Sequence, residues 1–180
     1  KSKIEGFIKR YNLNGCIESV KVTSSEEDNN LQTKFVSEER HVLGNVKLKG
    51  VSVGDCELGI YNTAQLKSML NVLGSDIEMS PTSVGDRVIS LNMKDTTASV
   101  DFMLADLSVI QKAPKPKGMP EWDVVIKLDK AFVNTFIKSK SALSEANTFT
   151  VLTDKKTKKL GMVLGYSSIA SNRISIDVET

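Results

Sequence analysis

The side chains best suited to acid–base or metal chemistry are few in this sequence, and their spacing does not favour it. His41 is the only histidine, and it stands among Glu39, Arg40 and Val42. A lone histidine without a nucleophile or second base beside it is more often structural than catalytic. The sequence contains no glycine-rich phosphate loop, Ser/His/Asp order or metal-ligand cluster. We therefore expect a protein that is not an enzyme and uses no cofactor and no metal.

Three other groups of reactive or charged residues have ordinary structural interpretations. The acidic triplet 26–28 lies in an asparagine-rich stretch and indicates a solvated loop, with metal binding as the alternative. The basic run 155–159 indicates a hairpin turn whose lysines favour solubility, and contact with nucleic acid is its other interpretation. Cys16 and Cys56 lack a CxxC spacing, so we expect small buried side chains of an intracellular protein, although a single disulfide stays open.

The composition is that of a folded protein without a strongly charged surface. The 180 residues are 40% hydrophobic and 26% charged, which suits one large domain or two small ones. A formal net charge of +2 is too small for a protein that grips nucleic acid by charge alone. No apolar run reaches the length of a membrane span and no signal peptide is recognisable, so we expect a cytoplasmic protein without a membrane partner.

An amphipathic helix is predicted over residues 62–73. Asn62 or Thr63 is suited to cap its first turn, and Gly74 is expected to end it with a positive φ. The apolar residues follow at i, i+3, i+4 and i+7 and so share one face. These residues are Leu66, Met69, Leu70 and Leu73.

The same pattern occurs twice more. Residues 129–137 repeat the cap, the alanine and the apolar trio at an offset of 67, and residues 1–11 repeat the trio at an offset of 62. Strand-like sequence follows each helix, so we infer a repeat of one strand, one helix and three strands. The alternative is that such a trio occurs in any surface helix. By the repeat, we expect a strand and a cap before Lys1, and a last repeat that is missing.

Short strands joined by polar turns account for most of the remaining sequence. Turns are predicted at Pro81–Asp86 and at Lys94-Asp95. Neighbouring strands with tight turns favour an α+β fold with antiparallel sheets. Alternating apolar and polar residues predict strands over 16–23, 31–36, 42–48, 56–61, 76–80, 87–93, 98–104, 148–153, 160–166 and 173–178, and a strand buried on both faces over 123–128.

A proline- and lysine-rich stretch divides the chain. Residues 112–120, KAPKPKGMP, hold three of the four prolines and predict an extended, semi-rigid linker. We place a first domain at 1–111 and a second, incomplete domain at 121–180.

In the order and spacing of these elements, the chain resembles the DNA polymerase sliding clamps. Residues 57–80, ELGIYNTAQLKSMLNVLGSDIEMS, are similar to a strand–helix–strand of tailed-phage clamps, and residues 123–137 are similar to the start of their second domain. The resemblance implies a PCNA-like DNA-clamp fold with the helices on one face. Two departures are the absent first strand and the absent last repeat, which would provide one side of the subunit contact.

The resemblance also implies a function and partners. Sliding clamps are ring oligomers, trimers in the phage family, that encircle duplex DNA without sequence preference. They tether the replicative polymerase as processivity factors and bind a clamp loader. For this chain, the resemblance implies work in DNA replication in the cytoplasm of a phage-infected bacterial cell. The competing interpretation is a two-domain β-rich interaction or virion structural protein without DNA binding.

Two sets of residues follow from the resemblance. Cations on the helix faces away from the core would approach DNA, and apolar residues at the linker entrance would bind peptide tails of partners. Taken alone, the same residues also fit solvated lysines and apolar side chains that pack under the linker. The DNA set is Lys3, Lys9, Arg10, Lys67, Lys130, Lys138 and Lys140, and the peptide set is Leu104, Leu107, Val109 and Ile110.

Overall fold

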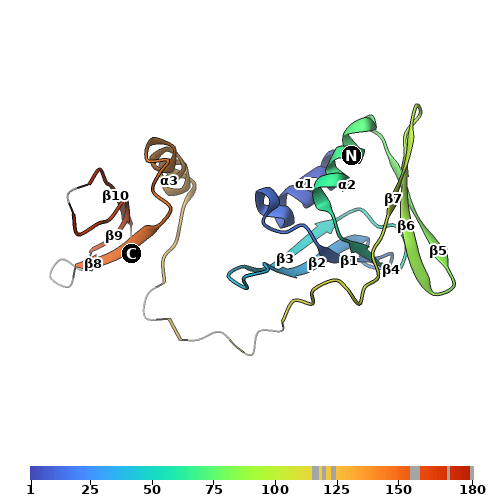
Figure 1. Ribbon diagram of the computed structural model, residues 1–180, viewed down its shortest axis with the longest axis horizontal. Coiled ribbons are helices and arrows are strands. Elements are labelled where there is room, and N and C mark those ends of the chain that lie inside the picture. The colour runs from blue at the N-terminus through green and yellow to red at the C-terminus, as the bar shows by residue number, and fades with distance from the viewer. Residues whose placement is uncertain (115–117, 119–120, 123–124, 155–158, 170, 179–180) are drawn as a thin grey trace. The chain divides into compact units, whose positions relative to one another are not determined.

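The computed structural model describes residues 1–114, 118, 121–122, 125–154, 159–169 and 171–178 (Figure 1). The chain forms two compact units, Lys1–Pro116 (unit 1) and Lys117–Thr180 (unit 2). Both units are α+β, and in each the strands are antiparallel. In the described residues, each of the three α-helices precedes three antiparallel strands, which confirms the fold class expected from the sequence.

Unit 1 begins with a helix that covers a four-stranded sheet. The strand order is β3-β2-β1-β4, so the strand that leads into the second helix completes the first sheet by pairing with β1. The elements are α1 (Ser2–Asn12), the 3₁₀ turn η1 (Leu13–Gly15), β1 (Val20–Ser25), β2 (Asn30–Val36), β3 (Leu43–Lys49) and β4 (Cys56–Ile60).

The second half of unit 1 is a helix followed by a three-stranded meander. Its elements are α2 (Thr63–Val72), β5 (Glu78–Val84), β6 (Arg87–Lys94) and β7 (Ser99–Met103), with the order β5-β6-β7. The two helices of unit 1 contact each other, α1 lies against β3, and α2 contacts β7 (Figure 1).

Unit 2 contains the third copy of this arrangement. Its elements are α3 (Lys130–Ala142), β8 (Phe149–Asp154), β9 (Lys159–Leu164) and β10 (Ile174–Val178). The sheet order is β10-β9-β8, so β9 is central, as β6 is in unit 1. Phe132 and Phe136 of α3 pack against buried residues of the sheet such as Leu164 and Met162.

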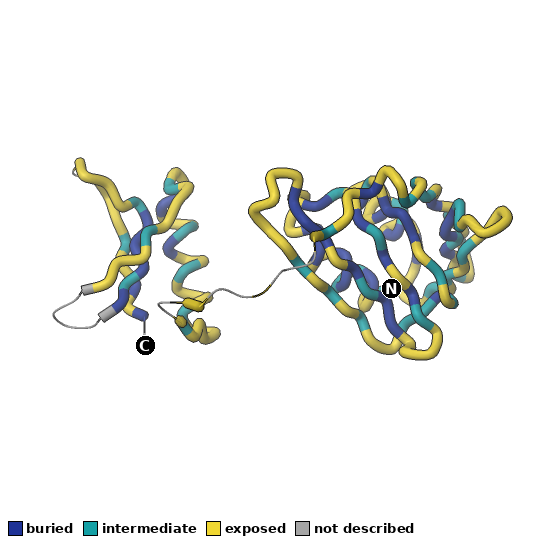
Figure 2. The backbone as a smooth tube through the Cα atoms, turned by 90° about the horizontal axis from the view of Figure 1, so that it is seen from below, coloured by how far each residue is buried: buried dark blue, intermediate teal, exposed yellow. Residues whose placement is uncertain are grey.

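The core of unit 1 lies between the helices and the sheets. The predicted apolar face of α1 is buried at all four positions, Ile4, Phe7, Ile8 and Tyr11. Along β1 the buried side chains alternate, because successive residues of a strand point to opposite faces. Figure 2 shows buried residues on the helices and on the strands beneath them.

Both predicted helix caps are present. The Asn62 side chain accepts a hydrogen bond from the Gln65 N–H at 2.8 Å, and the Asp129 carboxylate accepts one from the Phe132 N–H at 2.7 Å. Gly74 is not in the left-handed region, so its predicted role was wrong. Leu73 ends α2 in an extended conformation, and its N–H donates to the Leu70 carbonyl.

Two element boundaries differ from the sequence prediction. β1 begins at Val20 and not at residue 16, because Leu13 and Asn14 take positive φ values of 47° and 57° and turn the chain after α1. Pro81, predicted to open a turn, lies inside β5 and pairs with Leu91. An edge strand tolerates proline, because the missing N–H then faces away from the ladder.

The strand predicted over 123–128 is also not seen where it can be judged. Residues 123–124 lie outside the described part of the chain, and residues 125–128 form no strand there. Val125 is 79% exposed, so the expected burial on both faces is wrong at that position. The basic run 155–158 lies outside the described residues too. The cysteines are free thiols, with Cys16 exposed and Cys56 half-buried, which corrects the expectation that both are buried.

Candidate functional site

The cations predicted to face DNA in unit 1 lie on the exposed sides of its two adjacent helices. Lys3, Lys9 and Arg10 are exposed on α1, away from the buried stripe, and Lys67 is exposed on α2. Because α1 and α2 pack against each other, the structure brings these four side chains to one helical layer. A layer of this kind can make weak, sequence-independent contacts with phosphates.

The cations of α3 form a separate set in unit 2. Lys130 and Lys138 are exposed. Lys140 is half-buried, and its Nζ donates to the Ser144 carbonyl at 2.6 Å, just beyond the helix C-terminus. A cation there stabilises the negative end of the helix dipole. Lys140 therefore has a local structural role that the other two lysines do not share.

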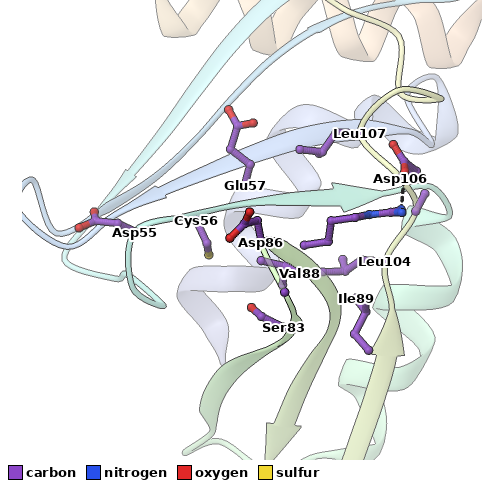
Figure 3. Close-up of a pocket in the computed structure, with 13 residues that line it drawn as sticks. Asp55, Cys56, Glu57, Ser83, Asp86, Val88, Ile89, Leu104, Asp106 and Leu107 are labelled. Carbon is purple, nitrogen blue, oxygen red and sulfur yellow. Dashed lines mark ion pairs between the residues drawn. The ribbon is translucent and has the colours of Figure 1, made fainter.

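The apolar residues predicted to bind peptides divide between a pocket and its surroundings. Leu104 and Leu107 line a pocket of about 540 Å³ in unit 1 (Figure 3). Val109 is 71% exposed and is not among the lining residues, whereas Ile110 is only 4% exposed. Ile110 is thus buried, Val109 is exposed outside the pocket, and Leu104 and Leu107 are the members of the set that line it.

Three segments that are distant in sequence build this pocket. They are the start of β4 (55–57), the β5–β6 hairpin end (83–89) and the segment after β7 (104–107). Figure 3 shows Leu104 beside Val88, and Leu107 apart from them, between Glu57 and Asp106.

Backbone hydrogen bonds fix the position of the segment after β7. The Leu104 N–H donates to the Ile89 carbonyl at 2.8 Å, and the Ala105 N–H donates to the Gly59 carbonyl at 2.9 Å. Gly59 permits this approach, because a Cβ at that position would lie 2.3 Å from the Ala105 carbonyl oxygen. The segment is therefore held against both β4 and β6.

The charges around the pocket are mainly negative. The lining contains four carboxylates, those of Asp55, Glu57, Asp86 and Asp106, and one guanidinium, that of Arg87, so its formal charge is −3. Arg87 forms an ion pair with Asp106. The Ser108 N–H, more than this guanidinium, holds the pKa of Asp106 below its usual value.

The other pocket groups are also engaged. Lys21, which is not in the lining, pairs with Glu57 at 2.5 Å, and the Asp55 carboxylate accepts from the Glu26 N–H at 2.8 Å. The Cys56 thiol has a raised pKa, first because of burial and then because of Asp55. A neutral thiol and fixed carboxylates do not form a nucleophilic centre.

Sequence reasoning found Leu104 and Leu107 but missed the rest of the pocket. The acidic residues at the start of β4 and in the hairpin have no motif of their own, and they stand 18 to 52 positions away from the segment they join. Pairing between β4 and the chain after β7 brings these acidic residues next to Leu104 and Leu107. The spacing of apolar residues in the sequence does not predict this pairing. Gly59, inside a predicted strand, is the one signal, since an interior glycine often marks a close approach of another backbone.

Membrane-spanning helices and metal-binding side-chain clusters are both absent from the described residues. In them, no helix is long and apolar enough to cross a membrane. The same residues contain no group of three or more His, Cys, Asp or Glu side chains that could hold a metal ion.

Comparison with known proteins gives a similarity among solved structures. No protein-family profile and no curated protein matches the chain. Among solved structures, the chain is similar to the DNA polymerase III subunit beta from Pseudomonas aeruginosa, with a TM-score of 0.46 and 12% sequence identity. The match covers 98% of this chain and 49% of that protein, so the chain spans about half of its length.

Proposed function

We propose that this protein is a non-catalytic sliding clamp that encircles duplex DNA and tethers a DNA polymerase as a processivity factor. The observation that carries the proposal is the helix followed by three antiparallel strands, found three times, each time with exposed cations on the helix. The resemblance of residues 57–80 to tailed-phage clamps suggests the same function, although no protein-family profile and no curated protein matches the chain. A ring oligomer, by analogy a trimer, a clamp loader and a phage-infected bacterial cell belong to this proposal.

The charge distribution suits a protein that holds DNA by topology. A ring does not need strong phosphate contacts, because breaking those contacts does not free it from the DNA. Dissociation requires the ring itself to open. Exposed cations on the helices with a net charge of only +2 fit weak contacts that permit sliding. The acidic pocket of unit 1 is unsuited to phosphate, so we assign it to protein partners such as the polymerase and the loader.

The test is retention of the full chain on nicked circular DNA, with linear DNA of the same length as the comparison. A clamp is retained on circles and lost from linear ends, after loading by its own loader or by spontaneous ring opening at high protein concentration. Equal loss from both substrates at a concentration where the oligomer has formed, measured by ultracentrifugation, would refute the clamp. It would favour a β-rich interaction or virion protein.

A matched pair of variants tests the DNA-facing layer. The double substitution Lys9→Ala/Arg10→Ala removes two cations from α1, whereas Lys34→Ala removes one from β2, between the buried neighbours Thr33 and Phe35 and so on the other side of that sheet. The slope of log affinity against log salt should fall by about 1.8 for the helix variant, at about 0.9 per phosphate contact, and stay unchanged for Lys34→Ala. Equal effects of the two variants would show that the helices are not the surface that contacts DNA.

A further inference from the structure

Unit 2 exposes apolar side chains at positions that unit 1 buries. On α3, Val133 and Ile137 occupy the positions of two buried leucines of α2, Leu66 and Leu70, but they are exposed. In unit 1, α1 lies beside α2. In the described part of unit 2, α3 has no second helix beside it, so the other half of this packing is not supplied there.

The first strand after each helix shows the same difference. The Phe149 ring of β8 meets the Phe136 ring of α3 at a centroid distance of 5.7 Å, so Phe149 and Val151 are on the helix side of β8. They are 53% and 44% exposed, whereas Val20 and Val22 of β1 are each 1% exposed. β1 has β4 along its second edge, and β8 pairs with β9 alone among the described residues.

Residues 125–128 stand in the chain where the covering strand of unit 1 stands. They precede α3 as β4 precedes α2, and the offset of 67 places Val125 at the position of Leu58. Leu58 pairs with Val22 of β1 and is 2% exposed. Val125 is 79% exposed, and residues 125–128 form no strand. Because β4 pairs with the first strand of the preceding repeat, this pairing joins two repeats. Within its described residues, a lone third repeat therefore leaves the edge of β8 open.

From this comparison we propose that the third repeats of two copies of this chain pack together and reproduce, between molecules, the contact that the first two repeats make within unit 1. α3 lies along α3 of the second copy, so that Val133 and Ile137 are covered, and residues 125–128 of each copy pair with β8 of the other. Each copy contributes the same surface, so the contact is isologous. It goes beyond the proposed function, because a ring closes through head-to-tail contacts and a two-fold contact is separate from them.

The exposed apolar surface is large enough for such a contact. At about 90 Å² apiece, the six exposed apolar side chains that the contact covers amount to about 1,100 Å² in the two copies, and a specific interface needs about 1,000 Å². Backbone pairing along the open edge of β8 adds to this area. The six side chains are those of Val125, Leu128, Val133, Ile137, Phe149 and Val151.

Two lysines of α3 limit how strongly the copies associate. In unit 1, the hydroxyl groups of Tyr11 on α1 and Thr63 on α2 are hydrogen-bonded at 3.2 Å, so the end of one helix meets the start of the other. At the repeat offsets, Lys140 and Lys130 of α3 occupy these two positions. The same packing brings Lys140 of one copy toward Lys130 of the other, and like charges oppose association. We therefore expect a contact that forms at protein concentrations on the order of tens of micromolar and is absent from dilute solution.

The test measures the mass of the full chain by sedimentation velocity from about 1 µM to about 200 µM, a range in which the mass should double. Ile137→Glu places a carboxylate at a position that is 58% exposed in the single copy, so unit 2 should stay folded while the contact is lost. At the highest concentration the variant should have half the mass of the parent. Hydrogen exchange in residues 125–128 and β8 should slow with concentration in the parent alone. Circular dichroism checks that the variant is folded.

Substitution of the lysines tests how the two helices are arranged. Lys130→Glu replaces a repulsion with an attraction to Lys140 of the second copy, twice in the dimer, and should lower the dissociation constant about tenfold. Lys138→Glu makes the same charge change at an exposed position of α3 and should change the dissociation constant by less than about twofold. Added salt should strengthen association of the parent and weaken that of Lys130→Glu, because salt screens repulsion and attraction alike.

Several outcomes would overturn the inference. They are a monomer mass up to the highest concentration, a mass that Ile137→Glu leaves unchanged, or equal effects of Lys130→Glu and Lys138→Glu. Retention on circular DNA by an assembly that Ile137→Glu does not alter would remove this inference and leave the clamp intact. A dimer that Ile137→Glu breaks, without retention on circles, would remove the clamp and leave this contact.

Discussion

Helices α2 and α3 have the same sequence pattern but very different surroundings. At matching positions, Leu66 and Leu70 of α2 are 3% and 0% exposed, whereas Val133 and Ile137 of α3 are 43% and 58% exposed. α2 has α1 beside it, and the described part of unit 2 contains no second helix. The comparison shows that an apolar stripe determines where a helix forms, whereas its neighbours determine how much of the stripe is buried.

Truncation of matching side chains in the two helices should give the largest effect of the substitutions considered. We expect Leu70→Ala to lower the free energy of unfolding of unit 1 by about 2–5 kcal/mol, because it leaves a cavity in a closed core. Ile137→Ala should cost unit 2 less than about 1 kcal/mol, because that side chain is already largely hydrated. Hydrogen exchange measured on peptides from each unit in urea separates the two. A large cost at Ile137 would mean that its face is covered in solution.

This comparison also shows how far sequence alone could predict the fold. The i, i+3, i+4 spacing identified all three helices, and side chains with cap chemistry located the starts of α2 and α3, because both signals are local. The β1 start was missed because residues 16–19, which follow the turn at Leu13, Asn14 and Gly15, belong to an alternating apolar pattern but form no strand. Val133 is exposed because the described part of unit 2 contains no second helix beside α3, and no residue of α3 indicates this.

In the candidate site, too, the features with a local sequence signal could be predicted and those that depend on distant contacts could not. Exposed cations on α1 and α2 could be predicted, because a residue off the apolar stripe of a helix faces away from the core. The pocket could not, because its position depends on how the chain after β7 meets β4. Two of the four predicted peptide residues, Leu104 and Leu107, line it, while Ile110 is buried and Val109 is exposed outside it.

Two strand glycines give the next test. A methyl group at Gly59 of unit 1 would lie 2.3 Å from the Ala105 carbonyl oxygen, whereas at Gly161 of unit 2 the nearest atom would be 3.8 Å away. Gly59→Ala should destabilise unit 1 by about 1–3 kcal/mol and speed hydrogen exchange at Ala105. Gly161→Ala should be close to neutral in unit 2. Similar costs at the two sites would contradict the close approach that forms the pocket.

The helix caps should behave alike despite the different surroundings. Asn62→Ala and Asp129→Ala each remove an acceptor for one orphan N–H of the first turn, and each should cost about 1 kcal/mol. Asn62→Asp and Asp129→Asn retain the acceptor and serve as controls. Urea unfolding followed by hydrogen exchange in each unit provides the measurement. A cost confined to one helix would show that capping, like burial, depends on the neighbours.

The smallest expected effect is a dependence of unit 1 on pH. The N–H groups of Gly74, Thr97 and Ala98 donate to the Asp95 carboxylate and hold its pKa well below its ordinary value. The depressed pKa of the folded state means that this stabilisation is complete above about pH 4 and is lost as the pH falls further.

Asp95→Asn tests this carboxylate. The variant should be less stable than the parent at neutral pH and should lose less stability on acidification. Thermal unfolding between neutral and acid pH measures both effects, with Asp76→Asn, an exposed change in the same region, as the control. Parallel pH profiles of Asp95→Asn and the parent would exclude the carboxylate as the cause.

The pairing of β4 with β1 has a consequence for the order in which the molecule can assemble. Val20 is opposite Ile60, so two strands that lie side by side are separated by 40 positions along the chain. During synthesis the first sheet cannot be completed until β4 has been made. Until then the edge of β1 that pairs with β4 has no partner strand. Such a non-local contact slows folding relative to the hairpins on either side. A cut between β3 and β4 would therefore leave the first sheet without its fourth strand, whereas the β5-β6-β7 sheet would keep all three of its strands.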